Sequence, residues 1–339
     1  MFRGLEKNFD KEKLKNINRN LWGIILAGGD GKRLNNFVKN LYGYNRPKQY
    51  CKIADNRSLI KLTRDRALTI IPPERLITIV NRPHLKFAAE EIGDQPSKTI
   101  VIQPSNRDTC AGILLPLLTV QNEDPTSIVA ILPADHFIYP ENRFMEYVKE
   151  AGIIVNKYPN IIVMLGVAPD HPESGYGWIE RGEQIQDKGN KKIYRVLKFW
   201  EKPSPKVTDL LFTSGCLLNT FVMVGSSSAF INYISLYAPK IYNAFNKIRS
   251  AINTQLELFA LEEVYNRIPS INFSHSVLEK IPQHLFVLEV KNVYWSDWGE
   301  EQRILRDTER FGLRRIKPKI PEVKDEQIIS NYMWKTFFF

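Results

Sequence analysis

The sequence predicts an α/β fold, with a mixed and mostly parallel sheet covered by helices on both faces. Short apolar, β-branched runs alternate with longer stretches of helical period through the first half of the chain, which is the rhythm of βαβ units. A glycine-rich turn follows the first of these runs directly. After Pro169 the pattern changes to hairpin-like strands, so the second half adds a mixed region to the same Rossmann-like sheet.

The first half contains five predicted strands and four predicted helices. Runs of strand length occupy residues 22–27, 76–80, 99–103, 128–132 and 161–167. Between them, apolar residues recur at helical spacing over residues 59–70, 84–92, 109–120 and 144–158. Strands joined by helical crossovers lie parallel in one sheet.

The second half is less regular. Gly175, Gly177 and Gly182 interrupt a hairpin, and a further strand at 194–200 ends before Pro203. Residues 229–278 are mainly helical in pattern, 285–290 and 293–296 return as strands, and 300–311 is a closing helix. We expect a polar N-terminal arm at 1–20, one domain at 21–311 and a C-terminal tail at 312–339.

The composition indicates a globular protein. The 339 residues include 43% hydrophobic and 25% charged residues, enough apolar material for a large core. No run approaches the roughly 20 apolar residues of a membrane-spanning helix, and residues 1–20 lack the apolar segment of a secretory signal. We therefore expect a soluble, cytoplasmic protein with no membrane partner. Cys51, Cys110 and Cys216 are an odd number and lie far apart, which disfavours a disulfide framework or a zinc site.

The formal net charge of +10 raises the question of a nucleic-acid partner. Lys and Arg are dispersed along the chain, and no motif typical of RNA or DNA binding is present. No nucleic-acid partner is expected. A positive cleft that attracts phosphorylated small molecules explains the charge better.

The glycine-rich turn spans Gly28 to Arg33 and reads GGDGKR. Its glycines let backbone N–H groups approach a phosphate, and its position after a strand is where open α/β sheets bind ligands. Two common glycine motifs are excluded by counting. A dinucleotide-binding fingerprint requires a glycine at position 34, where this chain has Leu34. A phosphate-binding ATPase loop requires a glycine at position 26 and Ser or Thr at position 33, where this chain has Leu26 and Arg33.

The motifs of this chain resemble those of sugar nucleotidyltransferases, and the Pro-Lys-Gln run is similar to that of mannose-1-phosphate guanylyltransferases. The matching segments follow the family's order: residues 26–34 (LAGGDGKRL), 46–49 (RPKQ), 103–109 (QPSNRDT), 132–136 (LPADH), 173–179 (ESGYGWI), 201–203 (EKP) and 295–299 (WSDWG). The resemblance covers residues 21–305. It implies the fold of nucleotide-diphospho-sugar transferases, with residues 21–311 as a single nucleotidyltransferase catalytic domain.

The implied reaction joins GTP to α-D-mannose-1-phosphate and gives GDP-mannose and pyrophosphate, by in-line attack assisted by Mg²⁺. Both reactants are anions, so positioning and charge neutralisation supply most of the catalysis, and no side-chain nucleophile is required. His136 is accordingly expected to be a structural residue rather than a base. The resemblance assigns catalysis to Arg33, Lys48, Asp135, Lys202 and Asp297.

The two aspartates of this set are the predicted metal ligands. Asp135 follows a predicted strand and Asp297 follows another, and carboxylate oxygens suit Mg²⁺ together with substrate phosphates. By resemblance, Lys48 contacts the nucleotide phosphates and Lys202 contacts the sugar phosphate. The implied nucleotide-binding residues are Ala27, Gly28, Gly29, Gly31, Gln103, Arg107 and Thr109. The implied sugar-binding residues are Gly175, Tyr176, Glu201 and Asn219.

The chain departs from the family pattern at several positions. The segment between Arg33 and Pro47 is longer than usual, Phe221 stands where the family has Gly, Asn106 also replaces a Gly, and Asp108 replaces an Asn. The choices of nucleotide and of hexose therefore stay open, and UTP or dTTP with glucose-1-phosphate is an alternative. A nucleotide-sugar-binding regulatory subunit without activity is a further alternative, although retention of all five catalytic residues disfavours it.

The C-terminal tail is charged and then aromatic, ending MWKTFFF at residues 333–339. Aromatic side chains in that number are costly to expose to water. We expect the tail to dock on its own domain or on the second subunit of a homodimer. Some guanylyltransferases continue into an isomerase domain, which this sequence does not contain, so a single activity is expected.

Overall fold

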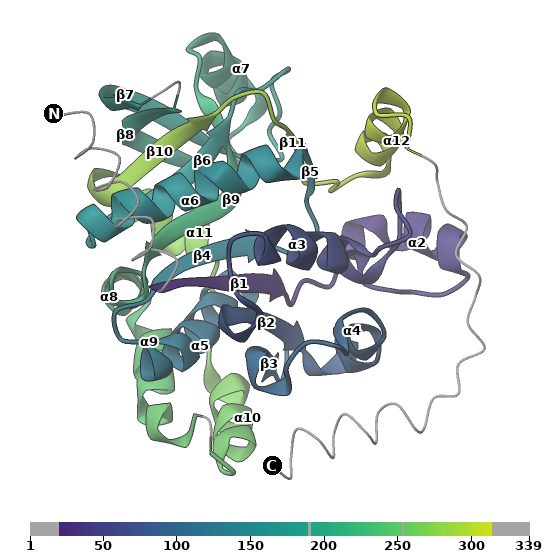
Figure 1. Ribbon diagram of the computed structural model, residues 1–339, viewed down its shortest axis with the longest axis vertical. Coiled ribbons are helices and arrows are strands. Elements are labelled where there is room, and N and C mark those ends of the chain that lie inside the picture. Colours follow the sequence, from purple (N-terminus) through teal and green to yellow (C-terminus); the bar gives the residue numbers. More distant parts are fainter. Residues whose placement is uncertain (1–19, 189–190, 253, 314–339) are drawn as a thin grey trace, which may run out of the picture.

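The computed structural model describes residues 20–188, 191–252 and 254–313 (Figure 1). Residues 1–19 of the predicted arm and 314–339 of the predicted tail lie outside the described residues. The described part contains a nine-stranded sheet in the order β3-β2-β1-β4-β9-β6-β10-β8-β7. The prediction of a mixed, mostly parallel sheet with helices is confirmed.

The parallel part of the sheet is formed by strands of the first half of the chain. Its members are β1 (Leu21–Ala27), β2 (Leu76–Asn81), β3 (Ile100–Gln103) and β4 (Ile128–Pro133). Each matches a predicted strand to within one residue at either end. The carboxyl ends of these strands meet at one edge, where the glycine-rich turn and the loop after β4 emerge together.

The strand in the middle of the sheet was not predicted. β9 (Leu217–Ser226) runs antiparallel to both β4 and β6 (Ile162–Val167). Its sequence, LLNTFVMVGS, is interrupted by Asn219 and Thr220, which obscure a strand pattern. β10 (Leu285–Val290) lies parallel to β6, and the hairpin of β7 (Gly177–Lys188) and β8 (Lys191–Glu201) completes that edge.

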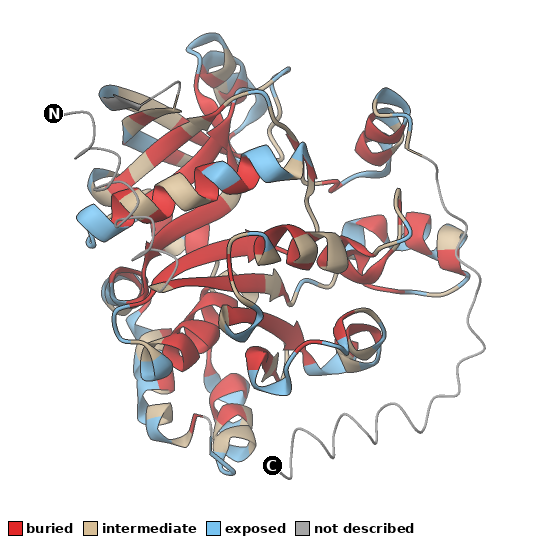
Figure 2. Cartoon of the chain, in the orientation of Figure 1, coloured by how far each residue is buried: buried red, intermediate tan, exposed pale blue. Residues whose placement is uncertain are grey.

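Helices cover both faces of the sheet. On one face β1 presents Ile25 to α3 (Leu59–Leu68), α4 (Leu85–Ile92) and α6 (Glu141–Lys157). On the other face Ile24 faces α5 (Asp108–Glu123), α8 (Ser227–Tyr237) and α9 (Pro239–Lys247). Successive residues of a strand point to opposite faces, so one strand contributes to both apolar cores. Strands β1, β2, β4, β6 and β9 are buried almost throughout, whereas the hairpin of β7 and β8 is partly exposed (Figure 2).

Five further α-helices and a small second sheet complete the described part of the chain. They are α2 (Asn35–Tyr42), α7 (Pro205–Thr213), α10 (Glu257–Arg267), α11 (Phe273–Ser276), α12 (Glu301–Arg310) and a small sheet of β5 (Phe137–Tyr139) with β11 (Tyr294–Ser296). A third apolar cluster joins α2 to α12 through Phe37, Val38 and Ile304. β11 and α12 flank the segment that carries Asp297, and α12 also contacts it through Arg303.

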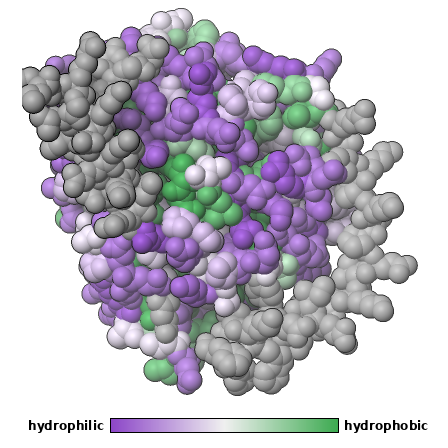
Figure 3. Space-filling view, in the orientation of Figure 1, coloured by the Kyte–Doolittle hydropathy of each residue, from purple (hydrophilic) through white to green (hydrophobic). Residues whose placement is uncertain are grey.

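The surface in Figure 3 is mostly hydrophilic, and apolar side chains show in restricted areas. Within the described residues, no helix has both the length and the apolar character needed to cross a membrane.

Candidate active site

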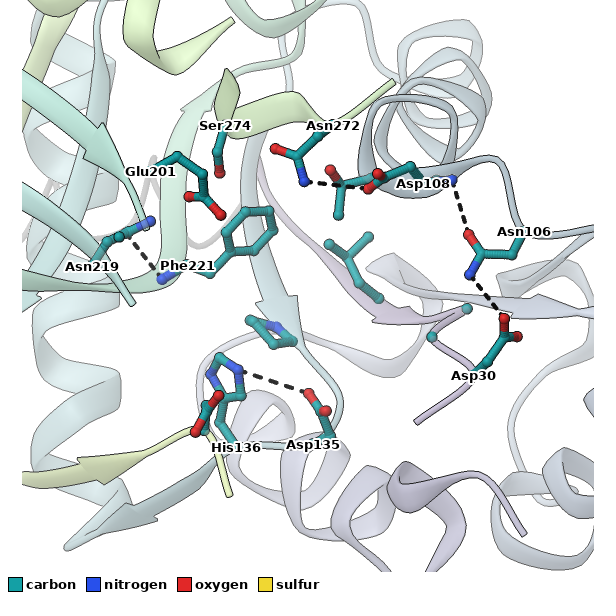
Figure 4. A pocket seen from close by; sticks show the side chains of 18 of the residues that line it. Asp30, Asn106, Asp108, Asp135, His136, Glu201, Asn219, Phe221, Asn272 and Ser274 are labelled. Carbon is teal, nitrogen blue, oxygen red and sulfur yellow. Dashed lines mark hydrogen bonds and ion pairs between the residues drawn. The ribbon is translucent and has the colours of Figure 1, made fainter. Parts of the chain in front are cut away.

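A cavity of about 640 Å³ lies at the carboxyl ends of β1, β3 and β4 and extends toward the ends of β8 and β11 (Figure 4). Most of the predicted site residues line it, although they come from every part of the domain. They are Gly28, Gly29, Arg33, Gln103, Thr109, Asp135, Gly175, Tyr176, Glu201, Lys202, Asn219 and Asp297. The fold therefore gathers the predicted nucleotide, sugar and metal residues around one space.

Four predicted site residues do not line the cavity. Ala27 is buried at the end of β1, and Gly31 adopts a φ of +65° that favours glycine. Arg107 donates from Nε to the carbonyl oxygen of Tyr265 at 2.8 Å, a contact that anchors α10. Lys48 is buried beneath the cavity, where its ammonium group contacts the segment of the metal candidates.

The glycine-rich turn is fixed from below by Gln49. Its Nε2 donates to the carbonyl oxygens of Ala27 and Gly29, each at 2.8 Å. On the other side, Asn81 Nδ2 donates to the carbonyl oxygen of Gly28 at 2.6 Å. These bonds direct the turn's carbonyl groups toward the protein. The Pro-Lys-Gln motif thus has a structural role that sequence reasoning did not assign.

Gln103 lines the cavity, but its amide is part of the same support. Its Nε2 donates to Asn81 Oδ1 at 2.5 Å, and its Oε1 accepts from Tyr265 Oη at 3.0 Å. A side chain at position 28 would collide with this amide, which explains the glycine there.

Lys48 joins the two predicted metal ligands. Its Nζ lies 2.8 Å from Asp135 Oδ2 and donates to the backbone oxygen of Asp297 at 2.5 Å. Burial is the largest single influence on Asp135 and would raise its pKa, but the charge and hydrogen bond of Lys48 together with the influence of His136 outweigh burial, so the pKa lies below its usual value. At Asp297, burial likewise raises the pKa while the positive charges of Lys48 and Arg303 lower it, and the net result is a pKa below the usual value. Both carboxylates are therefore ionised at neutral pH.

Asp297 is held by a group that sequence reasoning missed. Its Oδ1 accepts from Arg303 Nη1 at 2.6 Å, from Tyr176 Oη at 3.0 Å and from Gly299 N at 2.9 Å. Arg303 also forms an ion pair from Nη2 to Glu173 Oε2 at 2.9 Å and packs its guanidinium over the Tyr176 ring. It lies on α12 outside every matched motif, so no pattern in the sequence indicated it.

The two carboxylates are the candidate ligands of a divalent cation. Within the described part of the chain, the second oxygen of Asp297 has only Arg33 Nη2 at 3.7 Å, and Asp135 Oδ1 has only His136 Nε2 at 3.8 Å. One oxygen of each carboxylate is therefore left for a cation. No group of three or more His, Cys, Asp and Glu side chains that could hold a metal occurs in the described ranges, so substrate phosphates would have to complete the coordination of Mg²⁺.

His136 lines the cavity and is held between Trp295 and Asp135. Burial lowers its pKa to about 4, so the ring is neutral at pH 7. Trp295 Nε1 donates to His136 Nδ1 at 3.2 Å, which leaves the proton on Nε2, the nitrogen that faces Asp135.

The sugar end of the cavity is polar. Burial raises the pKa of Glu201 above its usual value. The Gly175 N–H, predicted to meet the hexose, donates here to Glu173 Oε1 at 2.9 Å. Asn219 accepts at Oδ1 from the backbone N–H of Phe221 at 3.0 Å, and the Phe221 ring points into the cavity (Figure 4).

A chain of polar side chains crosses the opposite wall. Asn106 Nδ2 donates to Asp30 Oδ2 at 3.5 Å, the Asp108 N–H donates to Asn106 Oδ1 at 2.9 Å, and Asn272 Nδ2 donates to Asp108 Oδ1 at 3.4 Å (Figure 4). Asn106 and Asp108 are two of the departures from the family pattern. Asn272, the residue before α11, and Ser274, within α11, line the cavity but lie outside the matched motifs and were missed.

Comparison with known proteins defines the class. The family model for nucleotidyl transferases matches residues 22–311, so the chain belongs to the nucleotidyl transferase family. Mannose-1-phosphate guanylyltransferase 2 of Escherichia coli O157:H7 is 29% identical over 290 residues, covering 83% of this chain and 58% of the relative. Mannose-1-phosphate guanylyltransferase RfbM of Salmonella typhimurium is 31% identical over 284 residues, covering 81% and 56%. The predicted resemblance is confirmed.

The chain spans less than three fifths of the length of these curated relatives. Among solved structures, a Thermus thermophilus protein described as mannose-1-phosphate geranyltransferase aligns with a TM-score of 0.70 at 24% identity, covering 84% of this chain and 79% of that one. At that identity the match supports the fold.

Proposed function

We propose that residues 21–311 form a catalytic domain that transfers the guanylyl group of GTP to α-D-mannose-1-phosphate, giving GDP-mannose and pyrophosphate. The observation that carries the proposal is the group of Asp135, Lys48 and Asp297 beside a cavity at the carboxyl edge of the sheet. The names of the curated relatives support the choice of substrates.

In the proposed reaction, an oxygen of the sugar phosphate attacks the α-phosphorus of the nucleotide and pyrophosphate leaves on the opposite side. Mg²⁺ held by Asp135 and Asp297 would neutralise the charge of the approaching phosphates. Lys48 keeps Asp135 ionised and holds the backbone at Asp297. No side chain needs to form a covalent intermediate, because the substrates carry both the nucleophile and the leaving group.

The cavity divides the substrates between two ends. In this proposal the triphosphate binds to the glycine-rich turn and to Arg33, whose side chain is exposed and lines the cavity. The sugar phosphate binds to Lys202, which lies beside Glu201 at the end of β8 and lines the cavity. Glu201 and Asn219 then face the hexose hydroxyl groups. A cytoplasmic location and a homodimer remain predictions.

A panel of nucleotide and sugar-phosphate pairs tests the proposal, with released pyrophosphate as the measurement. GTP with mannose-1-phosphate is expected to give the highest kcat/KM. A tenfold or larger preference for UTP or dTTP would contradict the guanylyl assignment but keep the transferase class. Absence of pyrophosphate with every pair, while nucleotide sugars still bind, would favour a regulatory subunit.

A further inference from the structure

The central strand β9 bulges beside the cavity. Met164 of β6 pairs with Met223 and Gly166 pairs with Asn219, so three residues of β9 face the single residue Leu165. The bulge is held by defined bonds. Thr220 Oγ1 donates to the Leu165 carbonyl oxygen at 2.7 Å and accepts from the Val222 N–H at 3.2 Å. Bulges next to active sites typically redirect one side chain.

The redirected side chain is Phe221. Its φ is +58°, in the left-handed region that glycine adopts freely and an aromatic residue rarely does. Asn219 supports this conformation by accepting from the Phe221 N–H at 3.0 Å. An unfavourable backbone conformation at a bulky residue persists only where the surroundings enforce it, and such positions cluster at functional sites.

The ring meets both the core and the cavity. It is half-buried, packs against the apolar cluster that includes α5 and α8, and lines the cavity wall. Figure 4 shows it pointing into the cavity beside Glu201, with Asn272 and Ser274 across from it. The ring is therefore an apolar surface set among polar groups.

A hexose has a polar rim of hydroxyl groups and apolar faces of C–H groups. In this space the rim can bond to Glu201 and Asn219 while a C–H face lies on the ring. A hydroxyl group turned toward the ring would lose its hydrogen bonds to water and gain no partner in the protein. A buried site therefore discriminates strongly against a sugar that carries such a hydroxyl group.

We propose that Phe221 determines the choice of sugar, by accepting hexose-1-phosphates that present a C–H face to the ring and rejecting epimers that turn a hydroxyl group toward it. This inference rests on the proposed function, because it requires that the polar end of the cavity binds the sugar phosphate.

The test compares the wild type with Phe221→Gly for mannose-, glucose- and galactose-1-phosphate, using whichever nucleotide the wild type uses best. The ratio of kcat/KM between the best and worst sugar is expected to fall at least tenfold in Phe221→Gly. The KM for the nucleotide is expected to change less than twofold. Asn292→Gly is a matched control, because Asn292 also has a positive φ, of +57°, but is exposed and does not line the cavity.

An unchanged sugar ratio in folded Phe221→Gly overturns the inference, as does an equal change in Asn292→Gly. If the glycine variant does not fold, Phe221→Leu replaces it, because leucine keeps apolar volume but has no flat face. A smaller fall in the ratio then supports the inference, and an unchanged ratio overturns it. Failure of the proposed function would appear in the wild-type panel, whereas failure of this inference appears only in the comparison of variants.

Discussion

At the residue scale, the candidate site depends on side chains that hold other side chains. Lys48 joins the Asp135 carboxylate to the backbone of Asp297, Gln49 holds the glycine-rich turn, and Arg303 holds the Asp297 carboxylate. Polar groups buried in this way are costly to leave unpaired, so each is expected to act both on stability and on the geometry of its partner.

Arg303 is expected to be a positioning residue for the metal. Its bond to Oδ1 of Asp297 turns the second oxygen toward the cavity, and loss of such supporting contacts typically weakens metal binding about 10- to 100-fold. Arg303→Met should raise the Mg²⁺ concentration for half-maximal rate by about tenfold or more, and Arg303→Lys should raise it less. Calorimetric binding of Mn²⁺ provides a second measurement.

The control for Arg303 is Arg267→Met, because Arg267 is an exposed arginine of α10 that pairs with Glu263 on its own helix. A purely structural role would lower thermal stability without changing the metal dependence. Unaltered Mg²⁺ and Mn²⁺ affinities in folded Arg303→Met would therefore contradict the positioning role.

Lys48 and Lys202 are expected to differ in kind. Lys202 is exposed beside Glu201, whereas Lys48 is buried against Asp135. Lys202→Ala should weaken the binding of mannose-1-phosphate more than the binding of GTP, and should leave the stability of the fold nearly unchanged. Lys48→Ala should weaken the binding of GTP more than the binding of mannose-1-phosphate. It should also lower the melting temperature, because the Asp135 carboxylate loses the positive charge beside it. Calorimetric titration of each ligand separately measures the difference, and equal losses for both ligands in both variants would refute it.

At the element scale, α12 holds the segment that carries Asp297 through hydrogen bonds. Asp307 is fully buried and accepts from Tyr294 Oη at 2.5 Å and from Trp298 Nε1 at 2.9 Å. These two aromatic residues bracket the predicted metal ligand in the sequence. The helix thus fixes both sides of Asp297, in addition to supplying Arg303.

Asp307 does not line the cavity, but Asp307→Ala should still lower both stability and activity. It leaves the buried Nε1–H of Trp298 unpaired, at a cost of about 1–3 kcal/mol of unfolding free energy, and removes one partner of the half-buried Tyr294 hydroxyl. It should also lower kcat/KM because Asp297 becomes less ordered. Thermal unfolding and pyrophosphate release are the measurements. Glu309→Ala, on the exposed face of the same helix, should change neither. Equal behaviour of the two variants would show that α12 does not hold the site.

The pattern of α12 explains why its role was not predicted. The closing helix itself was expected at 300–311 and is observed at Glu301–Arg310. Its buried face carries Arg303, Asp307 and Thr308 together with Ile304, so a search for apolar residues at helical spacing does not identify which face is inward. The partners of these polar residues lie on other elements.

At the scale of the whole molecule, the parallel half of the fold was predictable and the antiparallel centre was not. The strands β1 to β4 follow from local patterning, because each consists mostly of apolar residues. β9 is defined by pairing with β4 and β6, which lie far away in the sequence. Its bulge at Thr220 and Phe221 also breaks the alternation that would identify a strand.

The candidate site was predictable only where family motifs provide residues. Asp135 and Asp297 were placed by motif, and the fold brings both to Lys48. Asn272, Ser274 and Arg303 reach the cavity or its supports from segments without a recognisable motif. Only the tertiary structure identifies such residues.

Asp135 and Asp297 are expected to form the reactive centre of a metal-dependent nucleotidyl transfer, and the proposed function depends on them. Replacement by Asn keeps the size of each side chain but removes the charge. Asp135→Asn and Asp297→Asn should each reduce kcat/KM for the best substrate pair by roughly 10²-fold or more, about 2.7 kcal/mol. Asp209→Asn, an exposed carboxylate on α7, is the control.

The decisive experiment is the rate of pyrophosphate release by these variants as Mg²⁺ is titrated, with thermal unfolding recorded alongside. We expect large losses in both folded aspartate variants, partly recovered by excess Mg²⁺ or Mn²⁺, and no loss in Asp209→Asn. Near-normal rates at limiting Mg²⁺ in both Asp135→Asn and Asp297→Asn would contradict the proposed reactive centre, and the active site would have to lie elsewhere.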